Sequence, residues 1–309
     1  MTAPQAPNPG AGGAGALGQA AAKAAPGLFV LLWATGFIGA KGAMPHAEPM
    51  TFLFLRFVIA TALLGGFALL SGAPWPRGWR AWGHIAVVGL LVHACYLGGV
   101  FVAVHQGMTA GLSALIVSLQ PIIVALLAGR LLGERVKARQ WLGFLLGLAG
   151  VALVLSEKID PAATTAFAGF GWPQVLFCVF SVTAISLGTL YQKRYGGGMD
   201  LRSGTAIQYM AAGVACGLGA LFFEEFQVDW TGELIFSLAW LVIVLSVGAV
   251  TLLMLLIRLG EASKVASLFY LVPPCTALMA YLFFGETFGL VALAGLAVTA
   301  LGVALVVRK

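Results

Sequence analysis

The sequence predicts an all-α integral membrane protein of ten transmembrane helices, built as two inverted five-helix repeats with both termini in the cytoplasm. Three observations lead to this prediction. The chain contains ten apolar segments of membrane-spanning length, its cations collect at one side of those segments, and its second half repeats the first.

The composition indicates that lipid is the solvent for much of the chain. Of the 309 residues, 61% are hydrophobic and 9% are charged, and the mean hydropathy is +0.99. Soluble domains carry roughly 25% charged residues, so a soluble protein of this length could not hide this much apolar surface. The net charge of +6 is therefore interpreted through the positions of the cations and not as a nucleic-acid signal.

Ten stretches are apolar and long enough to cross a bilayer core of about 30 Å, which needs about 20 residues of helix. They cover about 27–44, 50–70, 82–104, 109–129, 138–156, 170–192, 204–223, 235–257, 263–284 and 288–307. Residues 1–26 are rich in Ala, Gly and Pro, so we expect a disordered cytoplasmic tail there. Residues 157–169 are expected to form a periplasmic linker.

The positions of the cations predict the orientation. If the N-terminus is cytoplasmic, 14 of the 17 Lys and Arg residues fall in cytoplasmic segments. The exceptions are Lys41 and Lys158, in outside loops, and Arg56, within the second apolar stretch. The positive-inside rule therefore favours cytoplasmic N- and C-termini, in what we expect to be a bacterial inner membrane.

An internal repeat divides the chain into 27–156 and 170–309. A shift of 152 residues places Pro121 on Pro273, Gly133-Glu134 on Gly285-Glu286, Gly143 on Gly295, Gly150 on Gly302, Lys41 on Lys193 and Arg56 on Gln208. Each repeat holds five helices, and two tandem copies with an odd number of helices must cross the membrane in opposite directions. Inverted repeats are typical of secondary transporters, in which the substrate site lies near mid-membrane where the halves meet.

Several short motifs point to a known family. They are Trp33-Ala-Thr-Gly-Phe37, Leu55-Arg56-Phe57, Gly107-Met-Thr-Ala110, and a proline followed by Gly-Glu at 121/133–134 and again at 273/285–286. Over about residues 27–307 the chain resembles the drug/metabolite transporter superfamily, specifically its EamA-type, ten-helix branch. Within that branch it looks most like the YddG-type amino-acid exporters, which implies export of aromatic and other neutral amino acids.

Nine aromatic or polar residues at membrane depth are candidates for substrate binding. They are Trp33, Phe37, Arg56, His93, Tyr96, Ser118, Gln120, Ser186 and Tyr270. The first two share one helix face by their i, i+4 spacing, although such a stripe is more often packing. Arg56 is costly at its depth and should face the bundle or a cavity, with outward snorkelling as the alternative. His93 and Tyr96 also share a face, where an interhelical hydrogen bond is the alternative role for the histidine.

Six residues are candidates for hinges or gates. They are Pro121, Pro273, Lys41, Lys193, Glu134 and Glu286. The two prolines each remove a backbone donor near the middle of a segment and should kink it. The glutamates and lysines end segments at corresponding positions of the repeats, which suggests gate ion pairs such as Glu286 with Lys41 or Arg56. Solvated end charges of little energetic value are the alternative.

The predicted function is export of small neutral or zwitterionic metabolites, most of all amino acids, by alternating access through a central cavity between the repeats. Export of other drugs or organic cations, carriage of a sugar or nucleotide-sugar-type metabolite, and a channel-like facilitator remain alternatives. The expected partners are a small-molecule substrate and the lipid bilayer, without nucleic acid, and a monomer is the working expectation.

No catalytic, metal or cofactor site is predicted, and the chain is not expected to be an enzyme. Cys95, Cys178, Cys216 and Cys275 lack the spacing of metal ligands. The sequence also lacks a P-loop and a GxGxxG motif at a strand-to-helix junction, so ATP is not expected to drive this chain directly.

Overall fold

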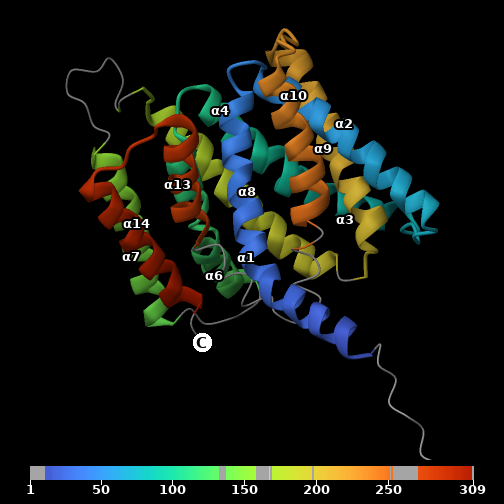
Figure 1. Cartoon of the computed structure of the whole chain (residues 1–309), viewed down its shortest axis with the longest axis horizontal. Helices are drawn as coiled ribbons and strands as arrows, with labels where there is room; N and C mark the ends of the chain where they lie inside the picture. Colours follow the sequence, from blue (N-terminus) through green and yellow to red (C-terminus); the bar gives the residue numbers. More distant parts are fainter. Residues whose placement is uncertain are drawn as a thin grey trace, which may run out of the picture.

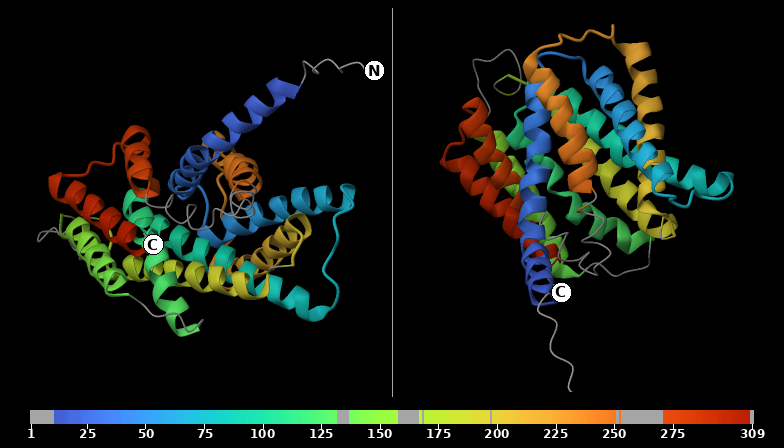
Figure 2. Two further views of the ribbon diagram at one scale, coloured as in Figure 1. Left: turned by 90° about the horizontal axis from the view of Figure 1, so that it is seen from below. Right: turned by 45° about the vertical axis from the view of Figure 1, so that its right-hand side comes forward.

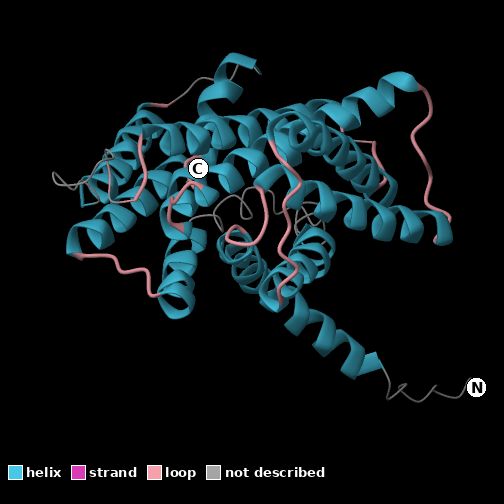
Figure 3. Ribbon diagram, turned by 90° about the horizontal axis from the view of Figure 1, so that it is seen from above, coloured by secondary structure: helices cyan, strands magenta, loops and turns pink. Residues whose placement is uncertain are grey.

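The computed structural model of the chain describes residues 11–131, 137–157, 167, 169–196, 198–250, 252 and 271–307. Within these ranges the regular secondary structure is helical (Figure 1), and the only β pairing there is two isolated bridges. Figure 3 shows the same helices joined by connecting loops at their ends. The all-α prediction is therefore confirmed for the described part of the chain.

The helices of the first half begin with a long α1. They are α1 (Ala11–Ala43), α2 (Pro49–Leu70), α3 (Trp79–Gly89), the π-helix η1 (Leu90–Cys95), α4 (Tyr96–His105), α5 (Ala110–Val117), α6 (Gln120–Leu131) and α7 (Ala138–Glu157). The helices of the second half are α8 (Trp172–Tyr195), α9 (Leu201–Phe223), α10 (Gly232–Ala239), the π-helix η2 (Trp240–Ala249), α13 (Val272–Phe284) and α14 (Leu290–Val307).

The first helix starts earlier than the sequence predicted. The expected tail is helical from Ala11 onward, because alanine is the strongest helix former and this segment is rich in it. The N-terminal part of α1 extends away from the other helices, as Figure 1 and the left view of Figure 2 show.

Five helical stretches are long and apolar enough to cross a membrane: Pro49–Leu70, Trp79–His105, Trp172–Tyr195, Leu201–Phe223 and Gly232–Ala249. The described residues also form shorter apolar helices at Gly27–Ala43, Ala110–Val124, Trp141–Glu157, Val272–Phe284 and Leu290–Leu305. Large apolar side chains such as Phe67, Phe222 and Phe283 lie exposed on the outside. An exterior of this kind fits contact with lipid and not with water.

Polar residues mark where several helices begin. Thr109 caps α5 by accepting a hydrogen bond from Leu112 N, and Thr231 caps α10 by accepting one from Leu234 N. Asp200 caps α9, where its carboxylate accepts hydrogen bonds from Arg202 N and from the Arg202 guanidinium. These bonds hold the pKa of Asp200 below its usual value.

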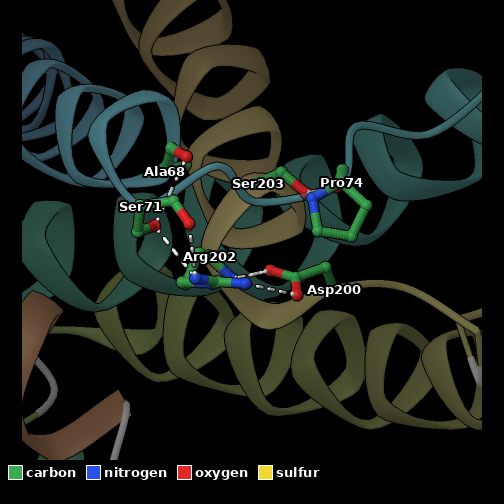
Figure 4. Close-up of polar contacts among 6 residues, drawn as sticks. All are labelled: Ala68, Ser71, Pro74, Asp200, Arg202 and Ser203. Carbon is green, nitrogen blue, oxygen red and sulfur yellow. Dashed lines mark hydrogen bonds and ion pairs between the residues drawn. The ribbon is translucent and has the colours of Figure 1, made fainter.

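Figure 4 shows how the start of α9 is tied to the end of α2. The Arg202 guanidinium, which pairs with Asp200, also donates to Ser71 Oγ at 2.9 Å. The neighbouring Ser203 hydroxyl donates to the carbonyl oxygen of Pro74 at 2.6 Å. These contacts join the segment after α2 to the beginning of α9.

Two of the predicted spans are interrupted by π-helical turns. Leu90–Cys95 separates α3 from α4, and Trp240–Ala249 follows α10 directly. A shift of 152 residues moves 90–95 onto 242–247, inside the second π segment. Turns of this type are rare and occur frequently at functional sites.

The main packing contacts join helices from the two halves of the sequence. α7 packs along α14, and α2 packs along α9. α1 contacts α10, η2 and α13, while α8 contacts α3, η1, α4, α5 and α6. Figure 1 and the left view of Figure 2 both show α7 and α14 side by side at one edge of the molecule.

Candidate functional site

A cavity lies where α1, α2, α4 and α9 meet the two π segments. Its empty volume is about 550 Å³, including the space at its open mouth. Thirteen described residues line it: Trp33, Gly36, Phe37, Arg56, Val92, His93, Tyr96, Leu97, Val100, Phe101, Tyr209, Leu245 and Val250. The lining is mostly apolar with a few polar side chains, which is typical of small-molecule sites.

Glycines bring α1 close to η2 at one wall of the cavity. A Cβ atom at Gly36 would lie 2.9 Å from Leu245 Cδ2, and one at Gly39 would lie 2.9 Å from Leu241 Cδ2. The absence of side chains therefore lets the two helices approach closely here. The aromatic residues Trp33 and Phe37 lie on the same helix as these glycines and also line the cavity.

Arg56 is the one Lys, Arg, Asp or Glu among the described residues that line the cavity. It is 2% exposed, and its Nε and Nη2 atoms donate to the Ser246 hydroxyl at 3.3 and 3.1 Å. Its guanidinium also lies 5.8 Å from the centroid of the Phe57 ring. Its Nη1 atom is buried and has no hydrogen-bond partner among the described residues.

An aromatic and amide cluster lies beside this arginine. His93 Nε2 and Gln208 Oε1 are 3.3 Å apart, and the His93 ring centroid is 4.4 Å from that of Tyr209. Tyr209 also stacks on Phe57 at 5.5 Å. Tyr96 lines the same cavity, and its hydroxyl hydrogen-bonds with the Trp33 side chain. The polar groups of the cavity are thus gathered at one place between hydrophobic walls.

The structure brings five of the nine predicted binding residues together, namely Trp33, Phe37, Arg56, His93 and Tyr96. The remaining ones that can be described do not line this cavity. The hydroxyls of Ser118 and Ser186 donate to carbonyl oxygens of their own helices. Gln120 Nε2 donates to Thr189 Oγ1 at 3.1 Å. Tyr270 lies outside the described residues.

The two predicted hinge prolines stand at helix starts. Pro121 is the second residue of α6, after a break at Ser118 and Leu119 that ends α5. Pro273 is the second residue of α13, after one 3₁₀ residue at Leu271. Proline is tolerated at this position because the first backbone N–H groups of a helix have no partner within it.

The gate ion pairs suggested for Glu286 are not present in the structure. The Glu286 carboxylate accepts a hydrogen bond from Ala110 N at 3.2 Å, at the start of α5, and Arg56 instead donates to Ser246. The described residues form two ion pairs, His46–Glu233 and Arg202–Asp200, and neither involves Lys41. Lys193 is exposed, and Glu134 lies outside the described residues.

Three site residues were not among the candidates taken from the sequence. Ser246 accepts the hydrogen bonds of Arg56, Gln208 pairs with His93, and Tyr209 lines the cavity. The internal repeat could have identified one of these three residues, because the 152-residue shift places Gln208 on Arg56.

The chain is similar to several membrane transporters. It is 29% identical over 293 residues to "Uncharacterized transporter YvbV" of Bacillus subtilis (strain 168), covering 91% of this chain and 90% of that protein. It is 28% identical to "Uncharacterized inner membrane transporter YedA" of Escherichia coli (strain K12), covering 90% of this chain and 89% of that protein.

A more distant relative carries a substrate class in its name. "Probable amino-acid metabolite efflux pump" of Escherichia coli (strain K12) is 23% identical and covers 43% of this chain and 42% of its own length. A solved crystal structure that is 20% identical superposes with a TM-score of 0.64 over 93% of this chain and 96% of that one. This likeness shows a shared fold.

The model of the EamA-like transporter family matches residues 27–156 and 172–308. These two matched segments contain every described residue that lines the cavity. The chain therefore belongs to the EamA-like transporter family and is an integral membrane transporter.

Proposed function

We propose that this chain exports small neutral or zwitterionic metabolites, with amino acids as the principal class, by alternating access through the cavity around Arg56. The observation that carries the proposal is the cavity itself. It combines one buried guanidinium with aromatic walls, and residues from both halves of the sequence line it. Such a site suits solutes that have both an apolar and a polar part.

Alternating access requires two halves that can exchange conformations, and the packing supports this requirement. Under the 152-residue shift, the α7–α14 and α2–α9 pairs map onto themselves. The contact of α1 with η2 maps onto the contact of α8 with η1, and both contacts occur. We therefore propose ten membrane crossings in two inverted repeats with both termini in the cytoplasm.

The polar contacts at the centre support the same two-fold relation. Arg56 of α2 bonds to Ser246 in the second π segment. Its counterpart under the shift, Gln208 of α9, bonds to His93 in the first π segment. Each half thus reaches into the π segment of the other half, as expected if the substrate site lies on an axis between the repeats.

Two of the relatives support the substrate class and the membrane. One relative is named a probable amino-acid metabolite efflux pump and another an inner membrane transporter. We accordingly propose a bacterial inner membrane as the location, and a YddG-type exporter as the subfamily.

Transport by the purified full chain in proteoliposomes tests the proposal. Vesicles preloaded with unlabelled phenylalanine should accumulate labelled phenylalanine by counterflow, which an open channel cannot support. Leucine should compete, whereas glucose and tetraethylammonium should not. Protein-free vesicles provide the control. If no amino acid moves with or without a pH gradient, the proposed function is wrong.

A further inference from the structure

The guanidinium of Arg56 is only partly used by the protein. An arginine side chain has five N–H donors, which form two forks that each match a carboxylate. The fork made by Nε and Nη2 is directed to Ser246 Oγ, at 3.3 and 3.1 Å. Nη1 is buried and has no hydrogen-bond partner among the described residues, so the second fork, made by Nη1 and the other hydrogen of Nη2, is not satisfied by those residues.

This free fork is unusual because the side chain is only 2% exposed. Burying a charge without a partner is costly, and arginines at membrane depth generally pair or mark a substrate path. Arg56 lines the cavity. The missing partner is therefore expected to be a group that enters the cavity with the solute.

The rest of the lining indicates the charge of that solute. Among the described residues that line the cavity, none is Asp or Glu. The described part of the lining thus offers a favourable site for one negative charge and no carboxylate for an ammonium group. A substituent with a full positive charge would lose its hydration here without gaining an anionic partner.

The other lining residues favour a solute whose remaining part is apolar. Trp33, Phe37 and Phe101 provide aromatic surface, and Tyr96 adds a further ring with a hydroxyl group to the same lining. A single guanidinium balances one carboxylate but not a doubly charged phosphate monoester. The chemistry therefore matches a monocarboxylate with an aromatic or aliphatic side chain.

We infer that this transporter recognises the carboxylate of its substrate through the free fork of Arg56 and does not recognise the α-amine. This inference rests on the proposed function and redefines its substrate class as amphipathic monocarboxylates, which include the zwitterionic amino acids and also simple carboxylate anions. It follows that deaminated acids bind as tightly as the corresponding amino acids, whereas amines that lack the carboxylate do not.

Binding to the purified full chain in detergent tests the inference without requiring transport. Isothermal titration should show that 3-phenylpropionate binds at least as tightly as phenylalanine, and that phenethylamine binds at least about tenfold more weakly, since a hydrogen-bonded charge pair is lost. Phenyl phosphate should bind more weakly than 3-phenylpropionate. Equal binding of phenethylamine and 3-phenylpropionate would overturn the inference, and so would binding of phenylalanine more than tenfold tighter than 3-phenylpropionate.

Variants at Arg56 test the fork itself. Arg56→Lys keeps the charge but loses the planar pair of donors, and Arg56→Gln removes the charge. Both should weaken 3-phenylpropionate binding, by roughly tenfold to a hundredfold for Gln. Arg80→Gln is the matched control because it removes an exposed arginine that stacks on Trp79, and it should bind as the parent does.

Size-exclusion chromatography and the comparison of binding with counterflow distinguish failure of the carboxylate inference from failure of the transporter proposal. Size-exclusion profiles identify any variant that fails to fold, in which case the ligand-selectivity series of the parent protein decides the matter alone. If phenylalanine undergoes counterflow but Arg56→Lys and Arg56→Gln bind 3-phenylpropionate unchanged, the carboxylate inference fails and the transporter proposal stands. If carboxylates bind but no solute moves, the transporter proposal fails and the recognition site stands.

Discussion

Gly150 of α7 lies directly against Gly295 of α14: a Cβ atom at Gly150 would be 2.5 Å from the Gly295 carbonyl oxygen, and one at Gly295 would be 2.6 Å from the Gly150 carbonyl oxygen. The repeat equivalents meet in the same way, because a Cβ atom at Gly302 would be 2.6 Å from the Gly143 carbonyl oxygen. The α7–α14 contact is thus a backbone-to-backbone contact that only glycine permits.

Gly150→Ala should therefore destabilise the protein by about 1–3 kcal/mol, the usual cost of forcing extra atoms into a packed contact. Thermal unfolding in detergent would measure the change. Gly66→Ala is the matched control, because a Cβ atom there has no neighbour within 4 Å and alanine favours helix. A Gly150→Ala protein as stable as the control would contradict the packing.

A second contact joins the start of α2 to the end of α9. The Glu224 carboxylate accepts hydrogen bonds from Met50 N, Thr51 N and Thr51 Oγ1 at 2.7, 2.7 and 2.8 Å. Glu48, the residue before α2, makes no side-chain cap of its own. Glu224, at the end of α9, therefore caps the N-terminus of α2 in its place. In return, the Glu48 carboxylate accepts from Glu225 N and Gln227 N.

Glu224→Ala is expected to lower the free energy of unfolding by about 1–2 kcal/mol, as the loss of a charged N-terminal cap does. Glu225→Ala should change it little, because the Glu225 carboxylate is exposed and accepts from the Gln227 side chain. Chemical denaturation of both variants, followed by intrinsic fluorescence, checks the difference. Equal effects of the two substitutions would show that the cap contributes nothing.

The inverted arrangement predicts the sides on which two loops lie. Arg77 and Asp229 are both exposed and are equivalent under the 152-residue shift. We expect Arg77→Cys to be labelled by an impermeant maleimide only after the cells are permeabilised, and Asp229→Cys to be labelled in intact cells. The four native cysteines are replaced by alanine in both variants and in the unlabelled control. Labelling of both positions from one side would rule out inverted repeats.

The cap of α9 predicts a pH dependence. Hydrogen bonds from Arg202 lower the pKa of Asp200 in the folded state. This contribution to stability is fully present above the pKa of the unfolded chain and is lost as the pH falls through the lower folded pKa. Asp200→Asn retains a good capping residue but cannot titrate. Its melting temperature should be slightly below that of the parent near neutral pH and should converge with it in acid.

The size of this effect should stay below about 1 kcal/mol, because both members of the pair are partly exposed to solvent, which screens their interaction. Asp229→Asn, in the exposed loop before α10, is the comparison. Melting curves from neutral pH downward, recorded for all three proteins, provide the measurement. A constant difference between the parent and Asp200→Asn at every pH would contradict the assigned role of the aspartate.

Hydropathy was sufficient to predict the helical class, and membrane depth was sufficient to select much of the cavity. Arg56, His93 and Tyr96 were selected because polar side chains are rare among apolar ones, and all three line the cavity. The same criterion also selected Ser118 and Ser186, whose hydroxyls bond within their own helices. A hydroxyl can satisfy itself locally in this way, whereas a guanidinium or an imidazole cannot.

Other parts of the site depend on contacts between distant segments. Ser246 is 190 positions from Arg56 along the chain, and its neighbours are as apolar as any other membrane segment, so nothing local marks it as a partner. The π segments are likewise invisible to hydropathy, because a wider turn does not change which residues are apolar. Residue type at one position indicates what a side chain can do, but not which helix it will meet.

The first π segment, Leu90–Cys95, also determines the direction in which the side chains of α4 point relative to α3. A π-helical turn accommodates about one residue more than an α-helical turn of the same rise, and one residue corresponds to roughly 100° of rotation about the helix axis. Without the extra residue in Leu90–Cys95, everything on α4 would point about 100° away from its present direction relative to α3. Tyr96 and Phe101 line the cavity because the extra residue rotates α4 just before them.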